Sequence, residues 1–303
     1  MSIRPILETR TARPTMEGAG VHLHRAFGFQ DPTELDPFLL FDDFRNEDPA
    51  YYRDGFPWHP HRGIETITYV LAGTVEHSDS LGNQGRLGPG SVQWMTAGSG
   101  ILHQEMPLGN AKGQMHGFQL WGNLPSAQKM TAPRYQDITG GDIPEVTDDD
   151  GTHVRVITGE FWGKRGPVDG IAADPQYLDV SVPAGVRKTF RIDTYRRAFA
   201  YVFHGAGMFT DASAPQGVLL EKEVMGREVN IRDMSGDRTL IRFGTGDEVT
   251  VQAGPEGVRF LLISGAPIEE PVAWHGPIVM NTQDELQQAM RDLRNGTFIR
   301  PAH

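Results

Sequence analysis

Residues 58–73 read WHPHRGIETITYVLAG, and this stretch decides the class of fold. Its second part, from Ile64 to Leu71, is rich in β-branched residues and ends at a glycine, which is typical of a β-strand. Short apolar runs of the same kind recur along the chain between turn sequences such as LGPG at residues 87–90. The 36 glycines and 21 prolines are spread over the chain, so we expect an all-β protein with little helix.

The first part of the same stretch contains His59 and His61, which are two positions apart. A second pair with this spacing, His103 and Glu105, lies in the run LHQE at residues 102–105. On an extended backbone such pairs point to one face. Two adjacent strands would therefore aim three imidazoles and one carboxylate at one point. This donor set predicts a site for a first-row transition metal, with positions open to water, substrate or oxygen.

Glu65 competes with Glu105 for the place of the carboxylate ligand. It lies four residues after His61, so it has the same parity along the strand and can face the same metal. Its other interpretation is an acceptor that orients a ligand imidazole or the guanidinium of Arg62. The residues alone leave both carboxylates as candidates.

Other motifs favour no additional site. His22 and His24 form a third pair with the same spacing, but no second cluster accompanies them, so we interpret them as partly exposed strand histidines. The glycine-rich triplets at residues 98–100 and 205–207 are not followed by a lysine with serine or threonine, or by a helical pattern. We interpret these triplets as turns.

Composition excludes several classes of function. With 28 Lys and Arg against 39 Asp and Glu, the formal net charge of -11 repels a phosphate backbone, so we expect no direct nucleic-acid binding. The chain has no cysteine, so any metal must rest on nitrogen and oxygen ligands. Neither a secretory signal nor a run long enough to span a membrane is visible. We expect a cytoplasmic protein without membrane contact.

The polar stretch at residues 140–152 predicts a boundary between two halves, 1–145 and 146–303. AYVFHG at residues 200–205 resembles TYVLAG at 68–73, and FGTG at 243–246 resembles LGPG at 87–90, which indicates an internal duplication. Matched in this way, the four candidate ligand positions correspond to Arg191, Asp193, Arg259 and Leu261. The second half has therefore lost the donor set.

The C-terminal stretch predicts one helix over about residues 282–296. Thr282 followed by Glu285 is a capping box, and Gly296 stands where a C-cap is expected. Between them, Leu286, Ala289, Met290 and Leu293 form one apolar stripe. We expect this helix to pack on a sheet.

Several of these motifs together resemble the pirin family of the cupin superfamily. They are HPHRGIET at 59–66, DSLGN at 79–83, PGSVQWMTAG at 89–98, GILHQEMP at 100–107 and WHGPIVMNT at 274–282. The resemblance runs from about Gly18 to Phe298 and implies a bicupin, two antiparallel β-barrels face to face, with one metal in the N-terminal barrel. By this resemblance the ligands are His59, His61, His103 and Glu105, with Glu65 and Arg62 as neighbours of the ligand shell.

The resemblance also implies an activity. Pirins are similar in activity to quercetin 2,3-dioxygenases, and the resemblance implies Fe(II) as the metal, although Zn, Mn, Ni or Cu also suits this donor set. The expected substrates are O2 and a flavonol such as quercetin, with Glu105 as proton acceptor and release of carbon monoxide. Five aromatic residues are candidates for the pocket wall or for ordinary core: Phe41, Phe44, Trp94, Phe118 and Trp121.

The family implies a second kind of function as well. Some pirins are regulatory proteins that bind a transcription factor or a metabolic enzyme, with the metal as a redox sensor, and eukaryotic members are nuclear. Under this alternative the protein has a protein partner. The two-barrel body is expected to stand as a monomer.

Overall fold

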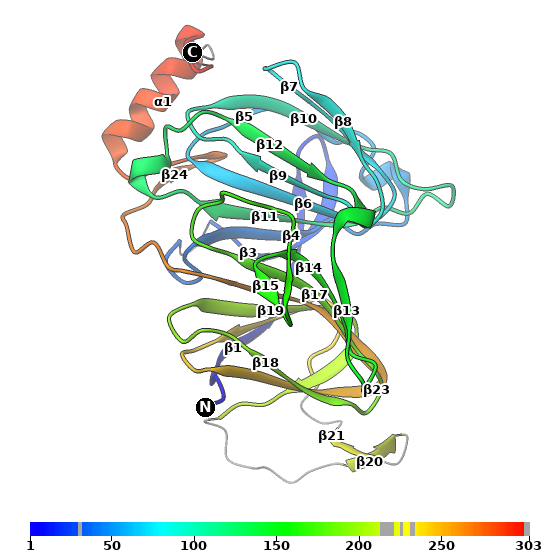
Figure 1. Ribbon diagram of the computed structural model, residues 1–303. Coiled ribbons are helices and arrows are strands. Elements are labelled where there is room, and N and C mark those ends of the chain that lie inside the picture. Colours follow the sequence, from blue (N-terminus) through cyan, green and yellow to red (C-terminus); the bar gives the residue numbers. More distant parts are fainter. Residues whose placement is uncertain (30–31, 213–220, 225–226, 231–233, 300–303) are drawn as a thin grey trace. The chain divides into compact units, whose positions relative to one another are not determined.

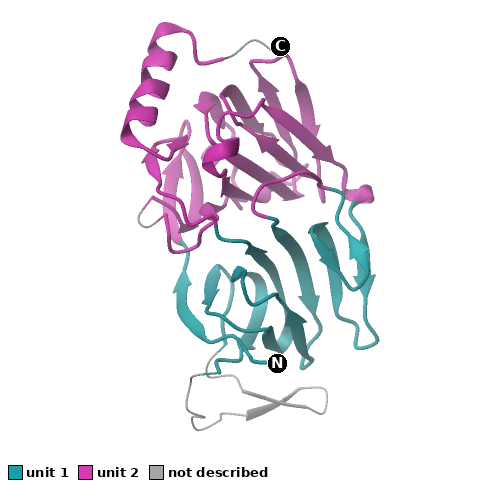
Figure 2. Ribbon diagram, turned by 60° about the vertical axis from the view of Figure 1, so that its left-hand side comes forward, with its two compact units in different colours: residues 1–12, 143–167, 174–267 teal, residues 13–142, 168–173, 268–303 magenta. Residues whose placement is uncertain are grey.

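The computed structural model describes residues 1–29, 32–212, 221–224, 227–230 and 234–299 (Figure 1). The chain forms two compact units (Figure 2). Unit 2 comprises residues 13–142, 168–173 and 268–303, and unit 1 comprises residues 1–12, 143–167 and 174–267. In the described residues both units are built from strands, and the α-helix belongs to unit 2. That helix is too short to cross a membrane.

The strands of unit 2 form three sheets. Seven strands pair in the order β12-β9-β6-β11-β4-β3-β2, four in the order β5-β10-β7-β8, and β24 pairs with β25. The elements are β2 (Arg13–Glu17), β3 (Val21–Phe27), β4 (Phe38–Asp43), β5 (Phe56–His61), β6 (Ile64–Ala72), β7 (Val75–Asp79), β8 (Gln84–Leu87), β9 (Val92–Thr96), β10 (Ile101–Pro107), β11 (His116–Asn123), β12 (Arg134–Ile138), β24 (Ala273–His275), β25 (Ile278–Met280) and α1 (Gln283–Asn295).

Strand β6 is the predicted strand of the opening stretch, and its first seven residues are all buried. It lies between β9 and β11, so both of its edges are hydrogen-bonded. Consecutive buried residues show that both faces of the strand are covered, and its buried polar residues are hydrogen-bonded, as Thr68 is to Glu105 and Glu65 is to Thr96. Strand β5 precedes it, and Gly63 in the turn between them has a positive φ of 76°.

Unit 1 is organised around one eight-stranded sheet. Its path is β1-β22-β19-β23-β17-β14-β13, with β18 paired to β23, and two short hairpins, β15-β16 and β20-β21, complete it. The elements are β1 (Ile6–Thr11), β13 (Glu145–Thr147), β14 (His153–Thr158), β15 (Glu160–Phe161), β16 (Lys164–Arg165), β17 (Gln176–Val182), β18 (Arg187–Arg191), β19 (Arg197–Phe209), β20 (Glu221–Val224), β21 (Arg227–Asn230), β22 (Thr239–Phe243) and β23 (Glu248–Gly265).

The all-β prediction is confirmed, and each half contributes one cupin-like unit. The sheets of both units are open rather than closed into barrels, because their outer strands do not pair with one another. The units also differ from the predicted division at residue 145. Strand β1 pairs with β22 of unit 1, and α1 packs on β24 and β25 of unit 2. Each end of the chain thus completes the unit formed by the opposite half.

Helix α1 has the predicted caps. The Thr282 side chain accepts a hydrogen bond from the Glu285 backbone, and Gly296 ends the helix in the left-handed conformation at a φ of 72°. The predicted stripe faces an apolar cluster formed with the β24–β25 hairpin and Phe298. The cluster comprises Ala273, Ile278, Met280, Leu286, Ala289 and Phe298, against which Leu102, Met290, Leu293 and Ile299 pack.

Candidate metal centre

Two adjacent antiparallel strands bring the three predicted histidines together. Strand β5 carries His59 and His61, and β10 carries His103. In the register between these strands, His103 lies opposite His59 and Ile101 lies opposite His61. The side chains of His59 and His61 point to one face because the two residues are two positions apart on a strand.

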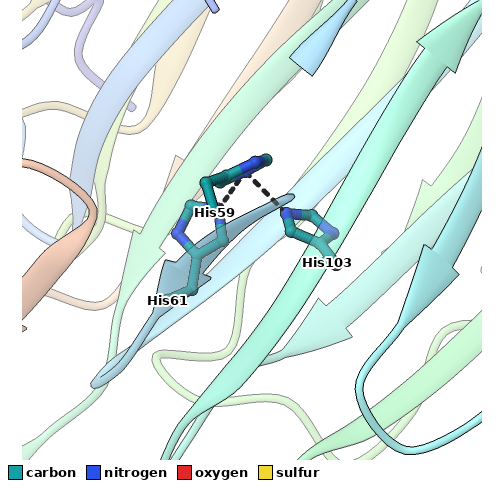
Figure 3. A group of neighbouring side chains, drawn as sticks. All are labelled: His59, His61 and His103. Atoms are coloured by element: carbon teal, nitrogen blue, oxygen red, sulfur yellow. Dashed lines mark hydrogen bonds between the residues drawn. The ribbon is translucent and has the colours of Figure 1, made fainter. Parts of the chain in front are cut away.

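The three imidazoles converge through their Nε2 atoms (Figure 3). Nε2 of His59 lies 3.0 Å from Nε2 of His61 and 2.9 Å from Nε2 of His103. All three ligand atoms lie within 4.8 Å of one another, and no other group of this kind is found in the part of the chain that the structure describes. A trio of nitrogen atoms at this spacing could hold one metal ion.

The tautomer of His59 is set by the backbone. Its Nδ1 lies 2.9 Å from the carbonyl oxygen of Pro57, which can only accept, so Nδ1 carries the proton. The Nε2 atom of neutral His59 therefore presents a lone pair to the other two rings. This arrangement, with the outer nitrogen bonded to a carbonyl, is the one that orients metal-ligating histidines in proteins.

The three rings are held in the neutral form. Burial lowers the pKa of His59. Burial, and secondarily the neighbouring imidazoles, lower the pKa of His61 and His103 well below the ordinary value for histidine. Neutral imidazole is the form that binds metal, so no proton has to leave these rings near pH 7.

Glu105 does not belong to this group of ligand atoms. The register between β10 and β5 shifts between His103 and Glu105, and Glu105 lies opposite Phe56. Its carboxyl group is buried, and Oε1 accepts a hydrogen bond of 3.0 Å from the Thr68 hydroxyl. Burial raises the pKa of Glu105 to about 7. It shares a cavity with His59 and His61, so it is a carboxyl group available at the same site.

The two predicted neighbours of the ligand shell have other partners. Glu65 is buried, and its Oε1 accepts a hydrogen bond of 2.7 Å from Thr96. The guanidinium of Arg62, which the sequence paired with Glu65, instead binds Asp292 and the carbonyl oxygen of Phe298. Arg62 thus connects the ligand strand to the C-terminal segment, a contact that spacing within residues 58–73 did not reveal.

A cavity of about 390 Å³ opens beside the histidines. Its polar wall includes Thr68, Gln119 and Glu105, and the Thr68 hydroxyl oxygen lies 2.8 Å from Oε1 of Gln119. Much of the rest is apolar. The apolar and aromatic lining comprises Val21, Leu23, Phe29, Leu40, Phe44, Tyr52, Phe56, Val75 and Trp121. A largely apolar lining with a few polar and charged groups, here also Glu17, Arg25 and Asp42, is typical of a small-molecule site.

The five aromatic candidates divide between the cavity and the core. Phe44 and Trp121 line the cavity. The other three are almost fully buried in the sheets, and Phe41 stacks on Phe118 at 5.7 Å. Trp94, on β9, is 2% exposed and belongs to the core.

Sequence reasoning missed Phe29 at the cavity. Phe29 is 46% exposed, has a positive φ of 61°, and lies 4.7 Å from the ring of Trp274. It also missed Gly276 and Pro277, which line the cavity from the C-terminal hairpin. Both residues belong to the motif WHGPIVMNT at 274–282, which supported the family resemblance but did not indicate that this segment lies near the histidines.

The pair His22 and His24 lies on β3, in the seven-stranded sheet. The ring of His22 stacks on Tyr51 at 4.5 Å, and His24 lies opposite Asp43 in the register with β4. In the described residues neither belongs to a group that could hold a metal. Both are intermediate in exposure, as a strand position predicts.

Comparison with known proteins agrees with this geometry. Residues 20–122 match the family model for pirin, and residues 177–299 match the model for the pirin C-terminal cupin domain. A pirin-like protein of Caulobacter vibrioides is 42% identical over 299 residues, which are 98% of this chain and 100% of that protein.

Two solved structures have the same fold. A quercetin 2,3-dioxygenase from Acinetobacter baumannii has a TM-score of 0.83 at 30% identity, covering 98% of this chain and 99% of that one. The bacterial pirin YhhW of Escherichia coli, solved in complex with nickel(II), has a TM-score of 0.60 at 21% identity, covering 86% and 99%. The extent of the sequence match over both units leads to one conclusion: the chain belongs to the pirin family.

Proposed function

We propose that this protein is a mononuclear metal-dependent dioxygenase of the pirin type, which uses O2 to cleave the ring of flavonols such as quercetin and releases carbon monoxide. The observation that carries the proposal is the convergence of three neutral imidazoles through Nε2, two of which, His59 and His61, line a largely apolar cavity. The name of the Acinetobacter baumannii structure supports this choice of substrate.

The residues fit a divalent metal ion. His59, His61 and His103 supply three nitrogen donors, and the Pro57 carbonyl fixes His59 in the tautomer that a ligand needs. We propose Glu105 as the fourth ligand, because it lines the cavity with two of the histidines and lies two residues after His103 on β10, whereas the cavity's other acidic residues, Glu17 and Asp42, bind Arg25. Fe(II) is the proposed ion, and Zn, Mn, Ni and Cu suit the same donors.

Bound at this site, the ion would lower the pKa of a flavonol hydroxyl and orient it for reaction with O2. The carboxylate of Glu105 would accept the hydroxyl proton, and burial equips it for this task by raising its pKa to about 7. Thr68 holds the carboxyl group in place through its 3.0 Å hydrogen bond. Trp121 and Phe29 provide aromatic faces on which the flat rings of a flavonol stack.

The test is an anaerobic loading of purified protein with Fe(II), followed by addition of quercetin and air-saturated buffer. The proposal expects one O2 consumed and one carbon monoxide released for each quercetin, measured with an oxygen electrode and by gas chromatography. The His59→Ala variant should release none. Protein that binds Fe(II) and quercetin yet produces no carbon monoxide would overturn the dioxygenase proposal in favour of a regulatory role.

A further inference from the structure

The guanidinium of Arg62 is buried directly after the ligand residue His61, and it binds the C-terminal segment. Arg62 is 2% exposed. Its Nη1 donates to Asp292 Oδ2 at 2.7 Å, and its Nη2 donates to the carbonyl oxygen of Phe298 at 2.9 Å. The guanidinium also lies 4.1 Å from the centre of the Phe298 ring. The side chain directly after β5 is thus bound by residues more than 200 positions later, and its Nε donates to the Ser99 carbonyl oxygen at 2.7 Å.

The backbone next to Arg62 is tied to the same segment. The Val279 amide donates to the carbonyl oxygen of Arg62 at 3.0 Å. The ammonium of Lys129, which is 1% exposed, donates to the carbonyl oxygens of Gly63 at 2.8 Å and Val279 at 3.1 Å. The buried Lys129 side chain therefore bridges the turn after β5 and strand β25, which the Val279–Arg62 backbone hydrogen bond also joins. The position of the turn after His61 depends on β25.

The second ligand strand meets the segment independently. Leu102, the residue before His103, packs against the apolar cluster that α1 forms with Phe298. A Cβ atom at Gly100 would lie 2.8 Å from the Phe298 carbonyl oxygen, so the backbones approach closely there. Both strands that carry the histidines thus contact residues 273–298.

We propose that Arg62 is a positioning residue that couples metal binding at His59, His61 and His103 to docking of the C-terminal segment, residues 273–298. This inference rests on the proposed metal site. Displacing the segment would remove the Asp292 and Phe298 acceptors of a buried guanidinium, whose Nε donates to the Ser99 carbonyl oxygen, and would allow β5 to move relative to β10, which spreads the three nitrogens. By linkage the effect is reciprocal, so a bound metal must also strengthen docking of α1.

The first test compares Arg62→Met with Arg4→Met in the full chain. Arg4 is a matched control, because it is 1% exposed and its guanidinium also donates to backbone carbonyl oxygens, those of Asp193, Arg196 and Gly244 in unit 1. Calorimetric titration with Ni²⁺ should show a Kd raised about tenfold or more in Arg62→Met. Arg4→Met should lower the melting temperature but keep the wild-type Kd within about twofold.

Milder variants separate positioning from general loss of structure. Asp292→Asn removes the charge partner and should raise the Kd for Ni²⁺ even if Arg62→Met does not fold. Arg62→Lys keeps the charge but not the forked donor geometry, so it should rescue binding only in part. The visible spectrum of bound Co²⁺ should change in both variants, which reports altered ligand geometry at equal occupancy.

The second test measures hydrogen–deuterium exchange of residues 283–295 with and without Ni²⁺. Slower exchange in the loaded wild type, and a smaller difference in Asp292→Asn, are the expected results. The coupling is overturned if Arg62→Met folds and binds Ni²⁺ with the wild-type Kd. It is also overturned if the exchange rate of residues 283–295 is the same with and without Ni²⁺. If the wild type itself binds no Ni²⁺ or Co²⁺, the metal site fails and takes this inference with it.

Discussion

Nε2 of His103 lies 2.9 Å from Nε2 of His59, although the two residues are 44 positions apart in the chain. Their strands are antiparallel neighbours, and the register places these two residues directly opposite each other. Two neutral imidazoles can place only one proton between two such nitrogens, and His59 keeps its proton on Nδ1. Without a metal, His59 Nε2 can therefore accept a hydrogen bond from His103 Nε2–H, and with His103 protonated on Nδ1 instead, the two facing lone pairs can bind one cation.

Replacing His103 with alanine should abolish stable metal binding. Loss of one of three convergent nitrogens should reduce the metal content of purified protein to about a tenth of the wild-type value or less. Mass spectrometry of acid-digested protein measures this content. His22→Ala is the control, since that histidine stacks on Tyr51 in another sheet. Equal metal loss in both variants, or none in His103→Ala, would contradict the assignment.

Glu105 gives the metal-free protein a specific pH dependence. Its folded pKa of about 7 exceeds the value near 4.5 of an unperturbed glutamate. The folded state therefore binds the proton more tightly, and this contribution to stability is present below about pH 4.5 and lost as the pH rises through 7. The loss amounts to about 3 kcal/mol.

Urea unfolding of chelator-treated protein at pH 5, 6, 7 and 8 measures the effect. Because Gln has no titrating group, Glu105→Gln should lose less stability than the wild type over this range. Parallel curves for the two proteins would show that Glu105 does not titrate in this window.

Truncating Phe29 should weaken flavonol binding. Its exposed ring lines the cavity beside Trp121, so Phe29→Ala should cost about 1–2 kcal/mol, a five- to thirtyfold rise in Kd for quercetin. Calorimetric titration under anaerobic conditions measures binding without turnover. Trp162→Ala is the control, because Trp162 also has a positive φ and is 40% exposed, but it lies in unit 1. An equal effect of both variants would argue against a role for Phe29.

Gly63→Ala should disrupt the turn between β5 and β6. An added Cβ would lie 1.9 Å from the carbonyl oxygen of Val279, and the φ of 76° already disfavours any side chain. We expect a loss of about 3 kcal/mol of unfolding free energy. Gly82→Ala is the control, because Gly82 has a φ of 90° but an added Cβ there would meet nothing within 4 Å. It should lower the unfolding free energy by only about 1 kcal/mol. Thermal unfolding followed by circular dichroism distinguishes the two variants. Similar melting temperatures would show that the clash with Val279 does not destabilise Gly63→Ala.

The histidine pairs were predictable because their signal is local. Parity along a strand aims His59 and His61 together, and the β-branched run after them identifies the strand. His103 and Glu105 also have the same parity on β10, and both are buried. The residues opposite them were not predictable, because the register with β5 shifts from His59 to Phe56 between them and such a shift depends on the partner strand.

The partners of Arg62 and Lys129 were not predictable for a different reason. Both are charged residues in polar surroundings of the sequence, where exposure is the ordinary expectation. They are buried because Asp292 and the carbonyl oxygens of Phe298 and Val279 arrive from the far end of the chain. Helix α1 was predictable from its caps and its apolar stripe, whereas the surface on which it packs, the β24–β25 hairpin, was not.

The exchange of chain ends between the two units has a consequence for biosynthesis. Strands β2 to β12 leave the ribosome early, but Arg62 lacks its Asp292 and Phe298 partners until residue 298 has left the exit tunnel. Residues 6–11 likewise wait for β22 before they can pair. The candidate metal centre, whose histidines lie within the first 103 residues, therefore gains the last contacts of the neighbouring Arg62 only when the C-terminal segment has been made.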